Sequence, residues 1–244
     1  MSDAPPPDHA MILAAGLGLR MRPITETLPK PLVEVAGRCM LDRVMDHLDE
    51  AGVTHRVVNI HWLGEKIRAH LAGRTHVTLS NEAERLLETG GGVAKALPWL
   101  GEAPFYVCNA DILWRNGPVP ALRRLAAAWD DSRMDALLLL TPTATAFGYE
   151  GWGDFFLDPQ GQARRRGEGE ISPTLFAGVQ ILHPRLFAQA PAGPFSLNLL
   201  YDQAAAAGRL FGIVHDGEWY HIGTPSALAE AEALLARRAR TGEA

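Results

Sequence analysis

The chain has 244 residues, of which 47% are hydrophobic and 21% charged, a balance typical of a globular protein with a sizeable core. Its formal net charge of −5 offers no general attraction for DNA or RNA, and no apolar run approaches the roughly 20 residues of a membrane span. The two cysteines, Cys39 and Cys108, show neither a metal-binding nor a disulfide spacing, which is typical of a protein from a reducing compartment. Together these features predict a cytoplasmic protein that binds neither nucleic acid nor membrane.

The first half of the chain alternates between short apolar runs and helical patterns. Residues 1–9 include three prolines and predict a disordered tail, and the glycine- and proline-rich segment 15–31 predicts a long functional loop. Strands are expected at 10–14, 56–60, 76–80, 104–108 and 136–140, and helices near 40–48, 62–72, 93–97 and 118–130. This alternation predicts a mostly parallel sheet with crossover helices.

The pattern changes after residue 142. The turn-forming segment 158–161 lies between two short apolar or alternating runs and predicts a hairpin. A strand is then expected at 176–182, helices near 184–189 and 196–207, a strand at 210–214 and a closing helix at 225–240. The second half is therefore expected to add a mixed region to the parallel sheet.

The strongest functional pattern is LAAGLGLRMRP at residues 13–23, followed by PKPL at residues 29–32. Glycines that follow a strand let the backbone turn and bring its N–H groups close to phosphate oxygens. Arg20 and Lys30 add charges that neutralise a polyphosphate. The pattern is neither a Walker loop nor a dinucleotide fingerprint, since residue 21 is Met, and a surface loop with incidental cations is the alternative.

Asp111 ends the segment Asn109-Ala110-Asp111, directly after the apolar run at 104–108. A carboxylate at the carboxyl edge of a parallel sheet lies where such sheets bind ligands, and Mg²⁺ prefers oxygen ligands. The alternative is an aspartate that only caps the following turn. From these residues alone both interpretations stay open.

Five segments together resemble the signature of the nucleotidyltransferases that activate sugar 1-phosphates, including glucose-1-phosphate thymidylyltransferases and mannose-1-phosphate guanylyltransferases. The short length is similar to the N-acetylmuramate-1-phosphate uridylyltransferases. The segments are 13–32, ETGGG at 88–92, NAD at 109–111, FAGVQIL at 176–182 and IGTP at 222–225. The resemblance implies a Rossmann-like three-layer α/β/α domain over residues 10–244, with a nucleotide-binding part at 10–142. The part at 143–244 would include a small β-rich region that binds the sugar and closes the site.

The activity implied by the resemblance is transfer of a nucleotidyl group from a nucleoside triphosphate to a sugar 1-phosphate, with release of pyrophosphate. UTP, N-acetylmuramate 1-phosphate and Mg²⁺ are the expected substrates and cofactor, in cell-wall sugar recycling, by a monomer or homodimer. A mannose-1-phosphate guanylyltransferase, or another transferase of this kind, is one alternative. A regulatory relative that binds nucleotide without turnover is another.

The resemblance also implies roles for single residues. Arg20 would stabilise the departing pyrophosphate, Lys30 would bridge the α-phosphate and the sugar phosphate, and Asp111 would hold Mg²⁺. The residues expected to contact the nucleotide are Leu13, Ala14, Ala15, Gly16, Gly18, Asn81, Gly90, Gly91 and Asn109. The residues expected to contact the sugar are Glu168, Thr174 and Asn198, although Glu168 fits a solvated turn equally well.

His221 departs from the family pattern, in which an aspartate usually precedes Ile/Val-Gly-Thr-Pro and shares the metal with the strand-end aspartate. Three interpretations follow from an imidazole at this position. It is a metal ligand less suited to Mg²⁺ than a carboxylate, or a cation for phosphate, or a side chain that only packs and forms hydrogen bonds.

Overall fold

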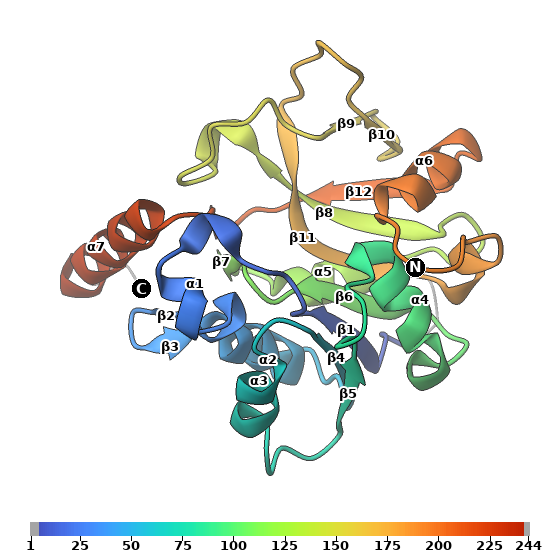
Figure 1. Ribbon diagram of the computed structural model, residues 1–244. Coiled ribbons are helices and arrows are strands. Elements are labelled where there is room, and N and C mark those ends of the chain that lie inside the picture. Colours follow the sequence, from blue (N-terminus) through green and yellow to red (C-terminus); the bar gives the residue numbers. More distant parts are fainter. Residues whose placement is uncertain (1–4, 242–244) are drawn as a thin grey trace.

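The computed structural model describes residues 5–241 and consists of a central mixed sheet between two layers of helices (Figure 1). The strands are β1 (His9–Leu13), β2 (Glu34–Val35), β3 (Arg38–Cys39), β4 (His55–Ile60), β5 (Val77–Asn81), β6 (Phe105–Asn109), β7 (Leu113–Arg115), β8 (Ala136–Pro142), β9 (Phe155–Leu157), β10 (Ala163–Arg165), β11 (Thr174–Leu182), β12 (Leu210–Val214) and β13 (Glu218–Tyr220). The helices are α1 (Ile24–Thr27), α2 (Met40–Glu50), α3 (Gly64–His70), α4 (Glu88–Leu100), α5 (Ala121–Ala128), α6 (Asn198–Ala206) and α7 (Pro225–Thr241).

Within the main sheet the strand order runs β5-β4-β1-β6-β11-β8-β12, with the hairpin β9–β10 joined to the first residue of β11. Strands β5, β4, β1 and β6 pair in parallel, and so do β8 and β12. Strand β11 runs antiparallel to both β6 and β8. The carboxyl ends of β1, β4 and β6 and the amino-terminal end of β11 therefore meet at one edge of the sheet.

The alternation of side chains along the strands divides the core between the two faces of the sheet. Ile12 and Val58 pack in one cluster with residues of α2, α3 and α5, whereas Met11 and Val57 pack in another with residues of α4 and α6. Successive side chains of a strand point to opposite faces, so nearly continuous apolar strands can be covered by helices on both sides. The three-layer α/β/α architecture that the resemblance implied is confirmed.

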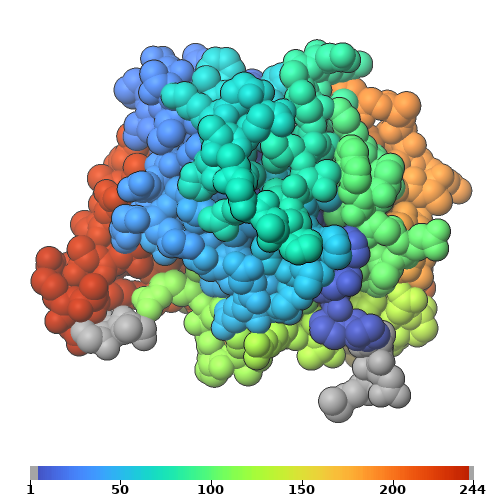
Figure 2. All heavy atoms as spheres, turned by 90° about the horizontal axis from the view of Figure 1, so that it is seen from below, coloured from blue at the N-terminus to red at the C-terminus, as the bar shows by residue number. Residues whose placement is uncertain are grey.

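A third, smaller cluster attaches the closing helix to the loop that follows β1. Ala231 of α7 is fully buried there, together with Met21 of the loop and Tyr220 of β13. Figure 2 shows a face built mainly by the N-terminal half of the chain, with α7 at its margin. The last helix therefore lies against the first loop, so residues at the two ends of the sequence can share one site.

The short elements α1, β2, β3, β7 and β13 were not predicted, and three predicted segments differ from the structure. The first strand begins at His9, inside the segment 1–9 expected to be a tail, and residues 1–4 of that segment lie outside the described residues. The helix expected near 184–189 is a short 3₁₀ segment, Pro184–Phe187. Residues 90–92, which precede the helix expected at 93–97, lie in the first turns of α4. They are glycines because other groups approach closely, since a Cβ on Gly90 would lie 2.3 Å from the Phe195 ring.

Candidate active site

A cavity of about 240 Å³, here called the strand-end cavity, opens where β1, β4 and β6 end. Eight of its lining residues were predicted to contact nucleotide, phosphate or metal: Leu13, Ala14, Ala15, Gly16, Gly18, Lys30, Asn109 and Asp111. The rest of the lining comes from Pro31, Asn59, Leu86, Glu88 and Thr89. This is the edge at which α/β sheets bind ligands, because loops diverge there and leave a crevice.

Two glycines shape the loop that borders this cavity. Gly18 has φ +62°, a left-handed conformation that favours glycine, and an added Cβ would lie 3.0 Å from Cγ2 of Thr25. The Thr25 hydroxyl donates a hydrogen bond of 2.8 Å to the Gly18 carbonyl, which ties the loop to α1. An added Cβ on Gly16 would meet no atom within 4 Å, so the backbone there faces open space.

Lys30 and Asp111, which are 81 residues apart in sequence, form an ion pair in which Nζ donates to Oδ2 at 2.7 Å. The Lys30 side chain is 10% exposed, whereas the Asp111 side chain is 39% exposed. The pair thus holds a nearly buried ammonium and a partly open carboxylate at the mouth of the cavity. Both residues line the strand-end cavity.

Arg20 and His221 lie on an adjoining surface hollow, together with Tyr149 and Thr224. Burial lowers the pKa of His221 below its ordinary value, and the positive charges of Arg20 and Lys30 lower it further, while Asp111 acts in the opposite direction. Arg20, Lys30, Asp111 and His221 are scattered along the sequence, but in the structure the first three lie close enough to His221 for their charges to shift its pKa. A lowered pKa leaves the imidazole neutral at neutral pH, which does not favour the interpretation of His221 as a cation for phosphate.

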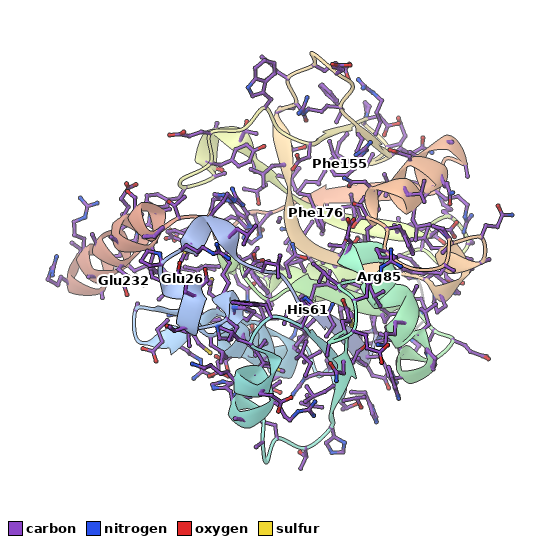
Figure 3. The ribbon with its side chains drawn as sticks, viewed as in Figure 1. Glu26, His61, Arg85, Phe155, Phe176 and Glu232 are labelled. Carbon is purple, nitrogen blue, oxygen red and sulfur yellow. The ribbon has the colours of Figure 1, made fainter. Side chains whose placement is uncertain are left out.

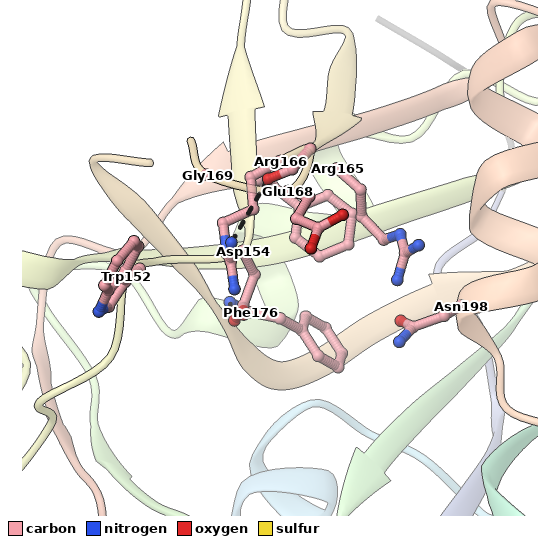
Figure 4. A pocket seen from close by; sticks show the side chains of 10 residues that line it. Trp152, Asp154, Arg165, Arg166, Glu168, Gly169, Phe176 and Asn198 are labelled. Carbon is pink, nitrogen blue, oxygen red and sulfur yellow. Dashed lines mark hydrogen bonds between the residues drawn. The ribbon is translucent and has the colours of Figure 1, made fainter. Parts of the chain in front are cut away.

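A second and larger cavity of about 830 Å³, here called the hairpin cavity, lies between β9–β10, β11 and the start of α6 (Figure 4). Two of the predicted sugar contacts, Glu168 and Asn198, line it. Its remaining lining residues are Trp152, Asp154, Phe155, Arg165, Arg166, Gly167, Gly169 and Phe176. Figure 3 shows Phe155 and Phe176 above His61 and Arg85, which belong to the N-terminal half of the chain.

The two cavities lie along the same strand. Gly178 of β11 lies beside the strand-end cavity, because a Cβ there would be 2.9 Å from Nδ2 of Asn109. Phe176, two residues earlier on β11, lines the hairpin cavity. A ligand that spans both cavities would therefore cross β11 near these residues.

Apart from Arg20 and His221, which lie on the adjoining hollow, four of the predicted site residues line neither cavity. The Asn81 carboxamide accepts a hydrogen bond from the Ala83 N–H, and the Thr174 hydroxyl donates to the Phe155 carbonyl. Gly90 and Gly91 are buried, and their N–H groups donate to the Phe195 carbonyl. Their proposed contacts with ligand stay predictions, and in this structure each of the polar groups named above forms a hydrogen bond within the protein.

Asn59, a lining residue, and Glu82 are polar side chains near the cavity that the sequence interpretation did not assign. Both are 2% exposed and joined by a hydrogen bond of 2.7 Å. The available sequence signal was a polar residue inside the apolar strand pattern at 56–60, because such a residue needs a buried partner.

Comparison with known proteins identifies the family. Residues 10–240 match the family model described as a MobA-like NTP transferase domain. The chain belongs to this family. It is therefore a nucleotidyltransferase, and the strand-end cavity lies at the sheet edge where such an enzyme needs phosphate-binding groups.

Two relatives extend the match over almost the whole chain. The N-acetylmuramate alpha-1-phosphate uridylyltransferase of Caulobacter vibrioides is 44% identical over 242 residues, which cover 97% of this chain and 99% of the relative. A protein of the same name from Neisseria meningitidis serogroup B is 36% identical and covers 92% of this chain and 97% of its own length.

Solved structures share the fold of this nucleotidyltransferase. A UDP-glucose pyrophosphorylase complexed with UDP-glucose has a TM-score of 0.76 at 16% identity and covers 95% of this chain and 99% of its own. HddC from Yersinia pseudotuberculosis complexed with GMP-PN has a TM-score of 0.71 at 19% identity and covers 93% of this chain and 99% of its own. Within residues 5–241, no helix is both long and apolar enough to cross a membrane.

The donor set at the cavity mouth fits a magnesium ion that is shared with phosphates. Mg²⁺ is commonly held by one or two carboxylates together with substrate phosphates and water, and Asp111 is a partly exposed carboxylate in the right place. The groups of three or more protein ligands in the described chain lie elsewhere, at Asp8/His9/His55 and at Cys39/Asp42/His70. A metal at Asp111 would therefore depend on the nucleotide for most of its ligands.

Proposed function

We propose that this nucleotidyltransferase transfers a uridylyl group from UTP to N-acetylmuramate 1-phosphate, giving UDP-N-acetylmuramate and pyrophosphate, as in cell-wall sugar recycling. The observation that carries the proposal is the 44% identity to the Caulobacter vibrioides uridylyltransferase over nearly the full length of both chains. The ion pair of Lys30 and Asp111 beside the glycine loop supports a phosphate-transfer centre at the strand-end cavity.

In the proposed reaction an oxygen of the acceptor phosphate attacks the α-phosphorus of the nucleotide. A new P–O bond forms while the bond to the bridging oxygen breaks, and the electron pair leaves with pyrophosphate. Lys30 would neutralise charge between the two reacting phosphates, and the exposed Arg20 would contact the departing pyrophosphate. A sugar phosphate is already anionic at neutral pH, so the reaction needs no general base.

The cofactor proposed for this reaction is Mg²⁺, held by Asp111. When bound, it supplies charge neutralisation to the phosphate oxygens. The neutral imidazole of His221 is available as a further ligand, although Mg²⁺ prefers oxygen. Whether or not His221 is a ligand, Asp111 would orient Lys30 through their ion pair.

The hairpin cavity is proposed as the acceptor site, with Arg166 as the group that recognises the carboxylate of the muramate lactyl ether. Arg164 and Arg165 are paired with Glu170 and Asp202, respectively. Arg166 forms no ion pair within the described part of the chain, and its Nε donates to the Gly153 carbonyl at 2.8 Å. A guanidinium without a carboxylate partner is suited to bind a substrate carboxylate.

A pyrophosphate-release assay tests the proposal with four substrate pairs. UTP or GTP is combined with N-acetylmuramate 1-phosphate or mannose 1-phosphate, with Mg²⁺ and again with excess chelator. We expect the highest kcat/KM with UTP and N-acetylmuramate 1-phosphate, and loss of turnover with chelator. A higher kcat/KM for GTP with mannose 1-phosphate would overturn the substrate assignment. Tight nucleotide binding without turnover for every pair would favour a regulatory protein.

A further inference from the structure

We propose that Asn59 and Glu82 are a buried positioning pair that holds two walls of the strand-end cavity at a fixed separation. The inference rests on the proposed function only in taking this cavity as the nucleotide site. Asn59 belongs to β4, and Glu82 follows the last residue of β5. Neither side chain is a candidate for chemistry, because each is 2% exposed and its polar atoms already have partners inside the protein.

The hydrogen bonds of the pair form one chain between the two walls. The Ala14 N–H donates to Oδ1 of Asn59 at 2.7 Å, and Nδ2 of Asn59 donates to Oε1 of Glu82 at 2.7 Å. Oε2 of Glu82 then accepts a bond of 2.9 Å from the Leu87 N–H. Ala14 begins the glycine-containing loop on one wall, and Leu87 precedes Glu88 and Thr89 on the other.

The orientation of the Asn59 carboxamide is determined by its neighbours. A backbone N–H can only donate, so the carboxamide oxygen must face Ala14. The amino group must then face the Glu82 carboxylate, which accepts on both oxygens. Position 59 therefore needs one acceptor and one donor, and position 82 needs two acceptors.

The wall anchored by Glu82 contains a residue in an unfavourable backbone conformation. Glu88, next to Leu87, has φ +59°, in the left-handed region that residues other than glycine seldom adopt. Such a conformation persists only where surrounding contacts enforce it, and it occurs often at binding sites. The bond from Leu87 to Glu82 is one such contact, immediately before the strained residue.

Helix α4 leaves space for the pair at one position. A Cβ on Gly92 would lie 2.9 Å from both Nδ2 of Asn59 and Oε1 of Glu82. In addition, no lysine, arginine or histidine side chain of the described residues forms an ion pair with Glu82, so neutral N–H donors hold the buried carboxylate. Loss of either partner would leave a buried polar group unpaired, and the separation of the walls would no longer be held.

The test exchanges the donor and acceptor between the two positions. In Asn59→Asp two carboxylates face each other. In Glu82→Gln the single amide oxygen can accept from only one of its two donors, Nδ2 of Asn59 or the Leu87 N–H, and the other donor then faces an amino group. In the double variant N59D/E82Q, the new carboxylate at position 59 can accept from the Ala14 N–H and from the new amide group at position 82. The oxygen of that amide can in turn accept from the Leu87 N–H. All three hydrogen bonds are thereby possible again without a change in side-chain length.

The measurements are the Kd for UTP by calorimetry, the KM values for UTP and for the acceptor, and the melting temperature. We expect each single variant to raise the Kd and KM for UTP about tenfold, with a smaller change in the acceptor KM, and the double variant to recover most of the loss. A double variant as impaired as the sum of the single variants would overturn the proposal. Single variants with a lower melting temperature but an unchanged Kd for UTP would overturn it as well.

Tyr201→Phe is the matched control, because it removes another buried hydrogen bond, from the Tyr201 hydroxyl to Oε1 of Gln180 at 2.8 Å, from a residue that lines neither cavity. We expect it to lower the melting temperature without changing the Kd for UTP. A tenfold weaker Kd in this control would show that destabilisation alone explains the result, which would also overturn the proposal. If the wild-type protein binds no UTP, the proposed function is wrong, and this result is obtained from the wild type before any variant is measured.

Discussion

The strand-end cavity is formed at the ends of parallel strands by the glycine loop, side chains such as Asn59 and Lys30, and the start of α4, whereas the hairpin cavity is lined largely by side chains of β9–β10 and the segments that flank them. The first has a volume of about 240 Å³, and its lining includes Ala14, Asn59 and the first two residues of α4. The second has a volume of about 830 Å³ and includes the exposed Trp152.

The difference indicates how the two substrates are recognised. A triphosphate can be bound by backbone N–H groups and a few charges, so its site can be part of the rigid sheet edge. A sugar has to be distinguished from other sugars by its substituents, and side chains on a hairpin can change without disturbing the core. We therefore expect substitutions in the strand-end cavity to change nucleotide binding, and substitutions in the hairpin cavity to change the kcat/KM for the acceptor.

The largest effect is expected from Lys30→Met. Removing the ammonium eliminates charge neutralisation between the reacting phosphates, and kcat/KM should fall about a thousandfold, or about 4 kcal/mol. Steady-state pyrophosphate release measures the change, and Lys66→Met serves as the control because Lys66 is exposed and only donates to the Thr27 carbonyl. Activity within a few-fold of wild type would remove Lys30 from the catalytic centre.

A pair of glycine variants should separate ligand contact from backbone strain within the strand-end cavity. Gly16→Ala adds a methyl group to open space, so the melting temperature should stay unchanged while the Kd for UTP rises about tenfold. Gly18→Ala places a Cβ in a left-handed conformation and against Thr25, so it should also cost about 1–2 kcal/mol of stability. Calorimetry gives the Kd for UTP and thermal denaturation gives the melting temperature of each variant. An equal decrease of the melting temperature in both variants would contradict the prediction that only Gly18→Ala introduces backbone strain.

A smaller effect, confined to the acceptor, is expected from Arg166→Gln. The kcat/KM for N-acetylmuramate 1-phosphate should fall about tenfold, which is about 1.4 kcal/mol, because its carboxylate loses a cation. The value for N-acetylglucosamine 1-phosphate, which has no carboxylate, should not change. Arg164→Gln is the control, since Arg164 is paired with Glu170 and lies over the Phe156 ring. Equal losses with both acceptors would exclude carboxylate recognition by Arg166.

The smallest effect concerns stability away from both cavities. Burial lowers the pKa of His215, and its Nε2 contacts the carbonyl oxygens of Arg115 and Glu218. On acidification below the ordinary histidine pKa of about 6.5, the unfolded chain takes up the proton first, so stability falls until the pH passes the lowered pKa of the folded protein. His215→Gln should reduce this slope in denaturation experiments, without changing UTP affinity at neutral pH. If the dependence of stability on pH were the same in His215→Gln as in the wild type, His215 would not be its source.

Local sequence was sufficient for most of the fold because strand and helix patterns are local. The predicted strands at 56–60, 104–108 and 210–214 correspond within one residue to β4, β6 and β12. The exceptions arise from contacts between distant segments. Residues 90–92 precede the helix expected at 93–97, yet they belong to α4. Their glycines are explained by the close approach of residues 193–195 to Gly90 and Gly91, and of Asn59 and Glu82 to Gly92.

The glycine loop, Arg20, Lys30 and Asp111 were singled out from the sequence, because their residue types and positions after strands suggest phosphate chemistry and because the segments that contain them resemble a nucleotidyltransferase signature. Their roles stay predictions. Only the tertiary structure decided which of these groups touch. It joined Lys30 to Asp111 across 81 residues, placed His221 near both, and formed the buried chain from Ala14 through Asn59 and Glu82 to Leu87. The physical reason is that a buried polar group is defined by its partner, and the partner is chosen by the packing of strands and helices that lie far apart in the chain.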